Sequence, residues 1–260
     1  MRILAIGDII GRPGRKAVQS LVPGLRREYG LDLVVANAEN AAGGKGLTST
    51  TADELFQSGV DVLTSGNHIW AQKEIIPYLD SSMPILRPLN YPSGVPGRGY
   101  LTIGHVMVVN VIGRTFMDNY DSPFQAMDTL LGEPGRKPPI IFVDFHAEAT
   151  AEKIAMINYL DGQISALVGT HTHVQTSDER IFPNGTGYIT DVGMTGPYES
   201  VIGMKVTPAI NRFIYQTPQK YETAENDSHL CGMYFKVDQE TGKTIELERI
   251  LFPEFIRKID

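Results

Sequence analysis

Two of the six histidines in this 260-residue chain lie two positions apart in the stretch GTHTHV, which follows the apolar run ISALV. Side chains at positions i and i+2 of a β-strand point to the same face, so His171 and His173 can converge on one point at a strand end. Two converging imidazoles are suited to binding a metal ion. The alternative is that the rings are only hydrogen-bonded where a strand meets a loop, and the other polar residues must decide.

Further polar side chains stand at the ends of other predicted strands. Besides the two histidines, they are Asp8, Glu39, Asn40, Asn67, His68 and His146. Ligands of open α/β sheets collect at the carboxyl ends of strands, so we expect all eight side chains to face one crevice. Carboxylates, amide oxygens and imidazoles suit manganese, iron or zinc. Each residue alone has a structural alternative, such as a helix cap or a turn hydrogen bond, but eight of these at successive strand ends would be a rare coincidence.

The elements that must position these residues alternate between strands and helices in the first half of the chain, which indicates an α/β protein. Apolar runs and end signals predict strands at 2–7, 32–37, 60–66 and 84–88, and helices at 14–30, 48–59 and 72–80. The second half predicts a hairpin at 100–113, strands at 138–148, 164–173 and 185–193, a helix at 150–162 and a final hairpin at 230–253. We expect a second, mostly antiparallel sheet to begin at residue 100. The predicted fold is a four-layer α/β sandwich, in which two mixed sheets are flanked by helices.

The chain is predicted to form one domain, residues 1–260, because it contains neither an internal repeat nor a convincing linker. Segments 114–138 and 193–228 lack strong periodicity. Long irregular segments in compact domains are often lids or binding loops, so both are candidate lid or cap segments. Disorder is an equal alternative for residues 217–228.

Composition narrows the functional class. The chain is 42% hydrophobic and 20% charged, as in an ordinary soluble globular protein. Its net charge of −7 argues against binding a nucleic-acid polymer, which requires a positive surface. Cys231 is the single cysteine, so a disulfide framework and a thiolate cluster are excluded. The start of the chain lacks a signal-peptide pattern and no run is long enough for a membrane span, so we expect a cytoplasmic protein without a membrane partner.

The polar motifs resemble, in order, those of the calcineurin-like metallophosphoesterases. Gly7-Asp8, Glu39-Asn40, GNH at 66–68, His146 and GTHTH at 169–173 correspond to the pattern D-x-H, G-D, G-N-H-[DE], H, G-H-x-H. Asp8-Ile9-Ile10 lacks the usual histidine, and Glu39 stands where the superfamily has a bridging aspartate. The stretches GDIIGRPGR, ANAENAAGGKG, SGNHIW and DFHAEATAEK resemble the YmdB-like bacterial branch, which contains cyclic-nucleotide phosphodiesterases.

The resemblance implies a dinuclear centre, with iron or manganese as the expected metals and zinc compatible. One ion would take Asp8, Glu39, Asn40 and His173, and the other would take Glu39, Asn67, His146 and His171. A metal-bridging hydroxide would then attack the phosphorus atom. His68 is the candidate general acid, although Ile69 replaces the acid that usually follows this histidine. The family also suggests a homo-oligomer, a dimer or higher.

Three functions remain open from the sequence. The first is a phosphodiesterase acting on a small phosphate ester, a cyclic nucleotide above all. The second is a phosphomonoesterase acting on nucleotides or sugar phosphates. The third, from a different class, is a metal-dependent nucleotide-binding regulator with negligible turnover. All three present a phosphate to the same cations, so the sequence does not separate them.

Residues outside the eight are assigned minor roles. Arg114 and Thr115 follow a predicted strand and are candidate contacts for substrate phosphate, with an ordinary surface arginine as the favoured alternative. His105 and His229 are expected to be surface or turn histidines. Asp144 and Asp191 lie inside strand-like runs, so we expect them to accept buried hydrogen bonds.

Overall fold

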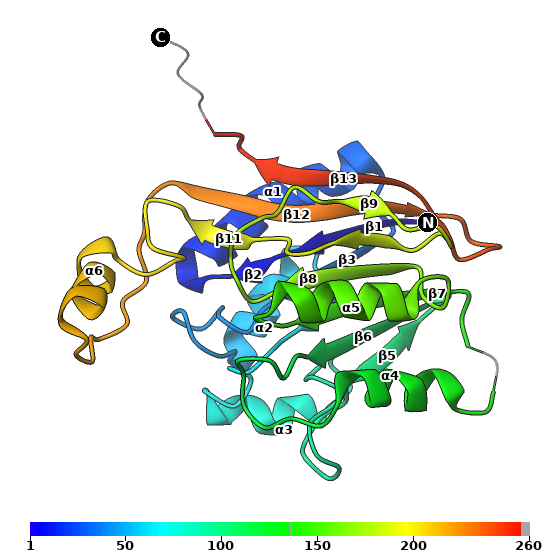
Figure 1. Ribbon diagram of the computed structural model, residues 1–260. Helices are drawn as coiled ribbons and strands as arrows, with labels where there is room; N and C mark the ends of the chain where they lie inside the picture. The colour runs from blue at the N-terminus through cyan, green and yellow to red at the C-terminus, as the bar shows by residue number, and fades with distance from the viewer. Residues whose placement is uncertain (136, 256–260) are drawn as a thin grey trace.

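The computed structural model of the chain describes residues 1–135 and 137–255 and contains two β-sheets (Figure 1). The first sheet has the strand order β2-β11-β12-β1-β3-β4, with β13 paired to β12. Its strands are β1 (Arg2–Ile6), β2 (Asp8–Ile9), β3 (Leu33–Asn37), β4 (Val62–Thr64), β11 (Met194–Pro197), β12 (Ser228–Val237) and β13 (Thr244–Phe252). The second sheet has the order β5-β6-β7-β8-β10-β9. Its strands are β5 (Tyr100–Ile103), β6 (Val106–Ile112), β7 (Ile140–His146), β8 (Ala166–Thr170), β9 (Arg180–Ile181) and β10 (Gly187–Ile189).

Apolar residues on both faces of each sheet produce four layers. Val35 of the first sheet and Phe142 of the second belong to one core that lies between the sheets. A second core joins the first sheet to α1 and α2, and a third joins the second sheet to α4 and α5. The helices are α1 (Gly11–Tyr29), α2 (Ser49–Gln57), α3 (Ile76–Leu79), α4 (Pro123–Gly132), α5 (Thr150–Leu160) and α6 (Val206–Tyr215), with a 3₁₀ turn η1 (Lys73–Ile75). The predicted fold class is confirmed.

The strand directions bring several strand ends to one edge. In the first sheet β1, β3 and β4 run parallel, and in the second β6, β7, β8 and β10 do so. The expectation of a mostly antiparallel second sheet is therefore wrong, since only the β5–β6 and β9–β10 pairs are antiparallel there. α4 and α5 supply the crossovers that parallel strands require. The prediction failed because segment 114–138, expected to be irregular, contains α4.

Other element predictions need smaller corrections. α1 begins at Gly11, three residues before its predicted start, and residues 84–88 form only single bridges at Ile85 and Leu86. Segment 193–228 contains β11 and α6, and α6 stands apart from the two sheets at the left of Figure 1. Whether this segment and 114–138 act as lids stays a prediction. Within the described residues, every helix is too short or too polar to cross a bilayer.

Candidate metal centre

Glu39, two residues after β3, lies at the centre of the predicted cluster and is buried. Its Oε1 lies 3.1 Å from Asn40 Nδ2, 3.3 Å from His146 Nε2 and 3.4 Å from His68 Nδ1. Burial alone would raise the pKa of Glu39, but the charge of His146 and hydrogen bonds from His146 and His68 lower it well below its usual range. Glu39 is therefore an anionic carboxylate that contacts three of the other candidates.

His146 ends β7, and its ring is completely buried. Nδ1 lies 2.9 Å from Thr170 Oγ1, while Nε2 lies 3.1 Å from Asn67 Oδ1 and 3.0 Å from His171 Nδ1. Burial lowers the pKa of His146, but the negative charge of Glu39 and its neighbours outweighs burial and raises this pKa to about 9. The surroundings of Nε2 therefore favour a positive charge at this position.

His171 and His173 reach the cluster by a different route from the predicted one. β8 ends at Thr170, and the two histidines follow it in a turn with φ of +100° and +66°. These values lie in the left-handed region, which residues other than glycine rarely adopt. Asp191 Oδ2 holds the turn by accepting hydrogen bonds of 3.1 and 2.8 Å from the backbone N–H and hydroxyl of Thr172. The prediction that strand alternation orients both rings is wrong, because this turn orients them.

In each of these two rings, one nitrogen, the outer one, has a partner outside the cluster. The other, inner nitrogen faces the cluster. His173 Nδ1 lies 2.9 Å from the carbonyl oxygen of Ile202, so Nδ1 carries the proton and Nε2 carries a lone pair. Nε2 lies 3.3 Å from Asn40 Nδ2. His171 Nε2 lies 3.1 Å from Glu148 Oε2, which leaves Nδ1 facing inward. Partners of this kind orient and fix the tautomer of metal-binding histidines.

Asp8 supplies a carboxylate oxygen that the protein itself does not satisfy. Its side chain is buried, and Oδ2 accepts a 3.0 Å hydrogen bond from the backbone N–H of His171. Oδ1 has no hydrogen-bond partner among the residues that the structure describes, although His173 Nε2 lies 3.8 Å away. Burial raises the pKa of Asp8, which the nearby histidines partly oppose. A buried, unsatisfied carboxylate oxygen is destabilising unless a cation or a donor meets it.

A metal centre fits these residues. One ligand atom from each of Glu39, His146 and His171 lies within 4.8 Å of the others. Gly66 stands against this space, because a Cβ there would overlap the His146 ring and the Glu39 carboxylate. The donors are carboxylate oxygens, amide groups and imidazoles, a set that suits borderline divalent ions. The structure thus brings together all seven predicted ligands, whose roles in binding metal stay predictions.

His68 lies at the edge of this cluster with its ring partly exposed. Nδ1 lies 2.8 Å from Asn40 Oδ1, and the backbone N–H donates to Glu39 Oε2 at 3.1 Å. Ile69, which replaces the expected acid, is buried in the core. Asn40 and Glu39 therefore orient His68 in place of the acid that Ile69 replaces.

Arg114 and Thr115 do not join the cluster. Their backbone N–H groups both donate to the carboxylate of Glu152, at 3.0 and 3.1 Å, and both side chains are exposed. None of the hydrogen bonds formed by the described residues links either one to the eight clustered side chains. Their proposed contact with phosphate stays a prediction, and the backbone amides are already engaged.

A buried network supports the turn that carries His171 and His173. Lys153 is completely buried, and its Nζ lies 2.8 Å from both the Thr170 carbonyl oxygen and Asp191 Oδ2. Asp144 accepts hydrogen bonds from Asn37 at 3.1 Å and from Thr170 at 2.8 Å. The predicted buried hydrogen bonds of Asp144 and Asp191 are confirmed. Lys153 escaped prediction, although its place on the apolar face of α5 was a signal; that face also contains Met156, Ile157 and Leu160.

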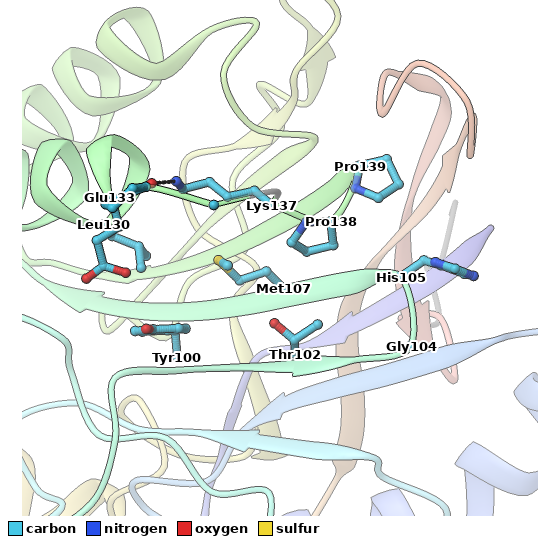
Figure 2. Close-up of a pocket in the computed structure, with 12 residues that line it drawn as sticks. Tyr100, Thr102, Gly104, His105, Met107, Leu130, Glu133, Lys137, Pro138 and Pro139 are labelled. Carbon is cyan, nitrogen blue, oxygen red and sulfur yellow. Dashed lines mark hydrogen bonds between the residues drawn. The ribbon is translucent and has the colours of Figure 1, made fainter.

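A cavity of about 540 Å³ lies away from this cluster (Figure 2). Tyr100, Thr102, His105 and Met107 line it. His105 immediately precedes β6, so it lies at the end of that strand opposite the metal centre, and it is exposed in a turn, as expected. The expectation for His229 is wrong, because β12 buries it and Asp227 Oδ1 lies 2.9 Å from its Nε2.

Comparisons with known proteins agree with one another. The family model described as YmdB-like protein matches residues 4–250. A 2',3'-cyclic-nucleotide 2'-phosphodiesterase of Bacillus subtilis is 48% identical over 255 residues, which cover 96% of this chain and 97% of that protein. The crystal structure of a protein from Thermus thermophilus matches with a TM-score of 0.91 at 44% identity, covering 97% of this chain and 99% of that one. A phosphatase structure from Mycoplasma pneumoniae matches with a TM-score of 0.91 at 34% identity, covering 97% and 93%.

Proposed function

The chain belongs to the YmdB-like family, as its motifs predicted, and we propose that it is a metal-dependent phosphodiesterase acting on small phosphodiesters, above all cyclic nucleotides. The activities named for its relatives, a cyclic-nucleotide phosphodiesterase and a phosphatase, are both phosphoric ester hydrolyses. The buried Asp8 Oδ1 is the single observation that carries the metal dependence, since this oxygen faces two histidines and has no hydrogen-bond donor among the described residues.

The proposed centre holds two ions. One set of ligands is Asp8, Glu39, Asn40 and His173, and the other is Glu39, Asn67, His146 and His171. Iron or manganese are the expected metals, and zinc also suits these donors. When bound, the ions would supply a nucleophile at neutral pH and positive charge for the phosphoryl oxygens.

The side chains around the centre keep it ready to bind. Glu39 remains ionised because His146 and His68 hold its pKa low, so it presents negative charge at neutral pH. His173 presents Nε2 because Ile202 fixes the proton on Nδ1. Burial of Glu39, Asp8 and His146 excludes water from the donor atoms and strengthens each electrostatic contact.

His68 is the proposed proton donor to the leaving oxygen. Its Nδ1 is occupied by Asn40, so Nε2 is the ring nitrogen left to meet a substrate at the partly exposed side of the ring. A ribose alkoxide leaves poorly without a proton, whereas a general acid at this position supplies one. His68 thus completes the reaction without being a metal ligand.

A parallel assay tests the proposed function. The protein loaded with manganese or iron would be incubated with 2',3'-cyclic nucleotides, bis-nitrophenyl phosphate and nitrophenyl phosphate. We expect diester hydrolysis that Asp8→Asn, which keeps the shape and removes the charge, abolishes together with metal binding. Turnover of the monoester alone would make the chain a phosphomonoesterase. Fully metallated protein that hydrolyses none of these esters would instead support a nucleotide-binding regulator.

A further inference from the structure

A second cavity, of about 700 Å³, lies between residues 87–100 and one side of α4. Tyr91, Arg114 and Tyr120 are among the residues that line it. It is large enough for a small organic ligand, for which pockets of roughly 300–1,000 Å³ are usual. None of the eight clustered side chains lines this cavity, so the proposed hydrolysis has so far assigned no function to the cavity.

A row of aromatic rings connects this cavity to the residues next to the metal centre. Trp70, two residues after His68, packs edge-on against Tyr91 with ring centroids 5.5 Å apart, and Tyr91 packs in the same way against Tyr120 at 5.1 Å. Three aromatic rings therefore form a row that leads from the turn of His68 into the cavity.

A second connection runs along the neighbouring strands. The Gly113 N–H donates to the carbonyl oxygen of His146 at 2.9 Å, and Arg114 is the next residue. Glu152 holds the Arg114 backbone at 3.0 Å. Arg114 therefore directly follows Gly113, which is hydrogen-bonded to the candidate ligand His146 at the end of β7.

The walls of the cavity are held in place. Asn90 Nδ2 donates to the carbonyl oxygens of Ile112 and Asp121, both at 2.8 Å, and Asn90 Oδ1 accepts from the Ile112 N–H at 2.9 Å. This buried side chain therefore ties the loop that carries Tyr91 to β6 and to the loop before α4. A site fixed in this way needs little reorganisation on binding.

The chemistry of the lining selects one class of ligand. Tyrosine rings offer a surface on which any nucleobase can stack. The Arg114 guanidinium makes no hydrogen bond or ion pair with a described residue, so its donors are free for a ligand. Arginine donors pair with two adjacent acceptors, such as O6 and N7 of guanine. An aromatic wall beside a free arginine is therefore better suited to a purine base than to a sugar alone.

We propose that this cavity is the subsite for the base of a nucleotide substrate, with the base against Tyr91 and Tyr120 and its acceptor edge toward Arg114. The proposal rests on the proposed function, because it assigns the non-reacting part of the same diester. It also gives Arg114 a role in selecting the substrate in place of the phosphate contact expected from the sequence.

Kinetics on two matched substrates test this subsite. Guanosine 2',3'-cyclic phosphate carries a base, whereas glycerol 1,2-cyclic phosphate has the same five-membered cyclic diester without one. For Tyr91→Leu we expect the ratio of kcat/KM for the nucleotide to that for the baseless diester to fall about 5- to 100-fold, the range that one lost stacking contact represents. Tyr91→Phe keeps the ring and should restore the ratio. Arg114→Leu, at an exposed side chain, should lower the ratio for guanosine more than for uridine.

Fluorescence gives a readout that does not depend on turnover. Trp70 is the single tryptophan and touches Tyr91, so its emission reports on the cavity. We expect guanosine 3'-monophosphate to change this emission saturably in wild type and Tyr91→Phe, and much more weakly in Tyr91→Leu. Inorganic phosphate alone should not reproduce the change. Phe252→Leu, at an exposed aromatic residue of β13, is the matched control and should behave as wild type.

Two results would overturn the subsite. They are an equal fall of kcat/KM on both diesters in Tyr91→Leu, and a guanosine titration that is the same in wild type and in that variant. Failure of the proposed function looks different, because wild-type protein would then hydrolyse neither diester. In that case the fluorescence titration still decides whether a base binds in the cavity.

Discussion

The ring of His68 is held by the side-chain amide of Asn40, whose Oδ1 lies 2.8 Å from Nδ1. The same amide presents Nδ2 to Glu39 Oε1 at 3.1 Å and to His173 Nε2 at 3.3 Å. An amide has the same shape when its oxygen and nitrogen exchange places. Turning Oδ1 toward the centre would place Nδ2 against His68, which would then accept at Nδ1 and carry its proton on Nε2. In the proposed centre, an Asn40 turned in this way would both bind a metal ion and set which nitrogen of His68 carries the proton that a general acid needs.

For His68→Ala we expect both metals to remain and the rate to fall unequally. A nitrophenolate leaves readily without a proton and a ribose alkoxide does not, so hydrolysis of cyclic nucleotides should fall about 10²- to 10⁴-fold and hydrolysis of nitrophenyl esters much less. Metal analysis and kcat on both substrates check this. Equal losses on the two substrates would leave His68 with a positioning role and no proton to deliver.

For Asn40→Ala we expect one ion to be lost more than the other. Asn40 touches His173, and both belong to the set that includes Asp8, so the ion held by that set should lose occupancy first. Anomalous scattering from crystals of the variant reports the two occupancies separately. Equal loss at both positions would show that the proposed division of ligands is wrong.

For Glu39→Gln we expect both ions to bind weakly. Glu39 contacts residues of both ligand sets. Two cations bound to adjacent ligand sets repel each other and require a shared negative charge between them. Metal analysis of the purified variant should give well under two equivalents. Glu246→Gln is a suitable control, because that carboxylate is half exposed and pairs with Lys236 of the neighbouring strand β12. Two full equivalents with unchanged activity would remove Glu39 from the centre.

The sequence predicted which residues cluster better than it predicted the backbone conformation that brings them together. Each candidate stands at or just after a strand end, so the parallel arrangement of β1, β3 and β4 in one sheet and of β7 and β8 in the other was enough to bring these positions to one edge. The turn at His171 and His173 was not predictable in this way. Asp191, 19 residues beyond Thr172, holds this turn with its positive φ values, and the residues around the two histidines contain no information about such a contact.

The fold prediction failed at two helices, α4 and α6, which lie in the segments that were expected to be irregular. α4 was missed although Ser122 at its N-cap and Pro123 in its first turn are typical signals of a helix start, and missing this helix made the second sheet seem antiparallel. α6 was missed although its sequence has an apolar stripe. Val206, Ile210 and Phe213 belong to this stripe, but all three are exposed and only Ala209 of the helix is buried, so the stripe does not pack on the core.

We expect the thiol of Cys231 to be unreactive in the native protein. Burial raises the pKa of Cys231 from an ordinary value near 9 to about 11, and the Tyr198 hydroxyl lies 2.7 Å from Sγ. The folded state therefore favours the neutral thiol, so this contribution to stability is present below pH 9 and is lost as the pH rises through about 11. Labelling with a thiol-reactive disulfide at pH 8 should occur only after urea unfolding. Fast labelling of native protein would contradict the burial.

The last prediction concerns Lys153 and the turn that it supports. Nζ contacts both the Thr170 carbonyl oxygen and Asp191, and Asp191 in turn holds Thr172 between the two histidines. Lys153→Met fills a similar volume but leaves Asp191 buried without its cation, a change that typically destabilises a protein by about 3–5 kcal/mol. We expect urea denaturation to show a loss of this size, and calorimetric titration to show weaker metal binding, because the turn loses its anchor.

A matched substitution separates this effect from the loss of any lysine. Lys205 forms an ion pair of the same 2.8 Å length with Glu222, but that pair is exposed. Solvent screens such pairs, so Lys205→Met should change neither the urea midpoint nor the metal affinity appreciably. A Lys153→Met protein with wild-type stability would mean that Asp191 finds another partner. Lost stability with unchanged metal affinity would mean that the turn keeps its shape without the lysine, and that Thr172 and Asp191 suffice to orient His171 and His173.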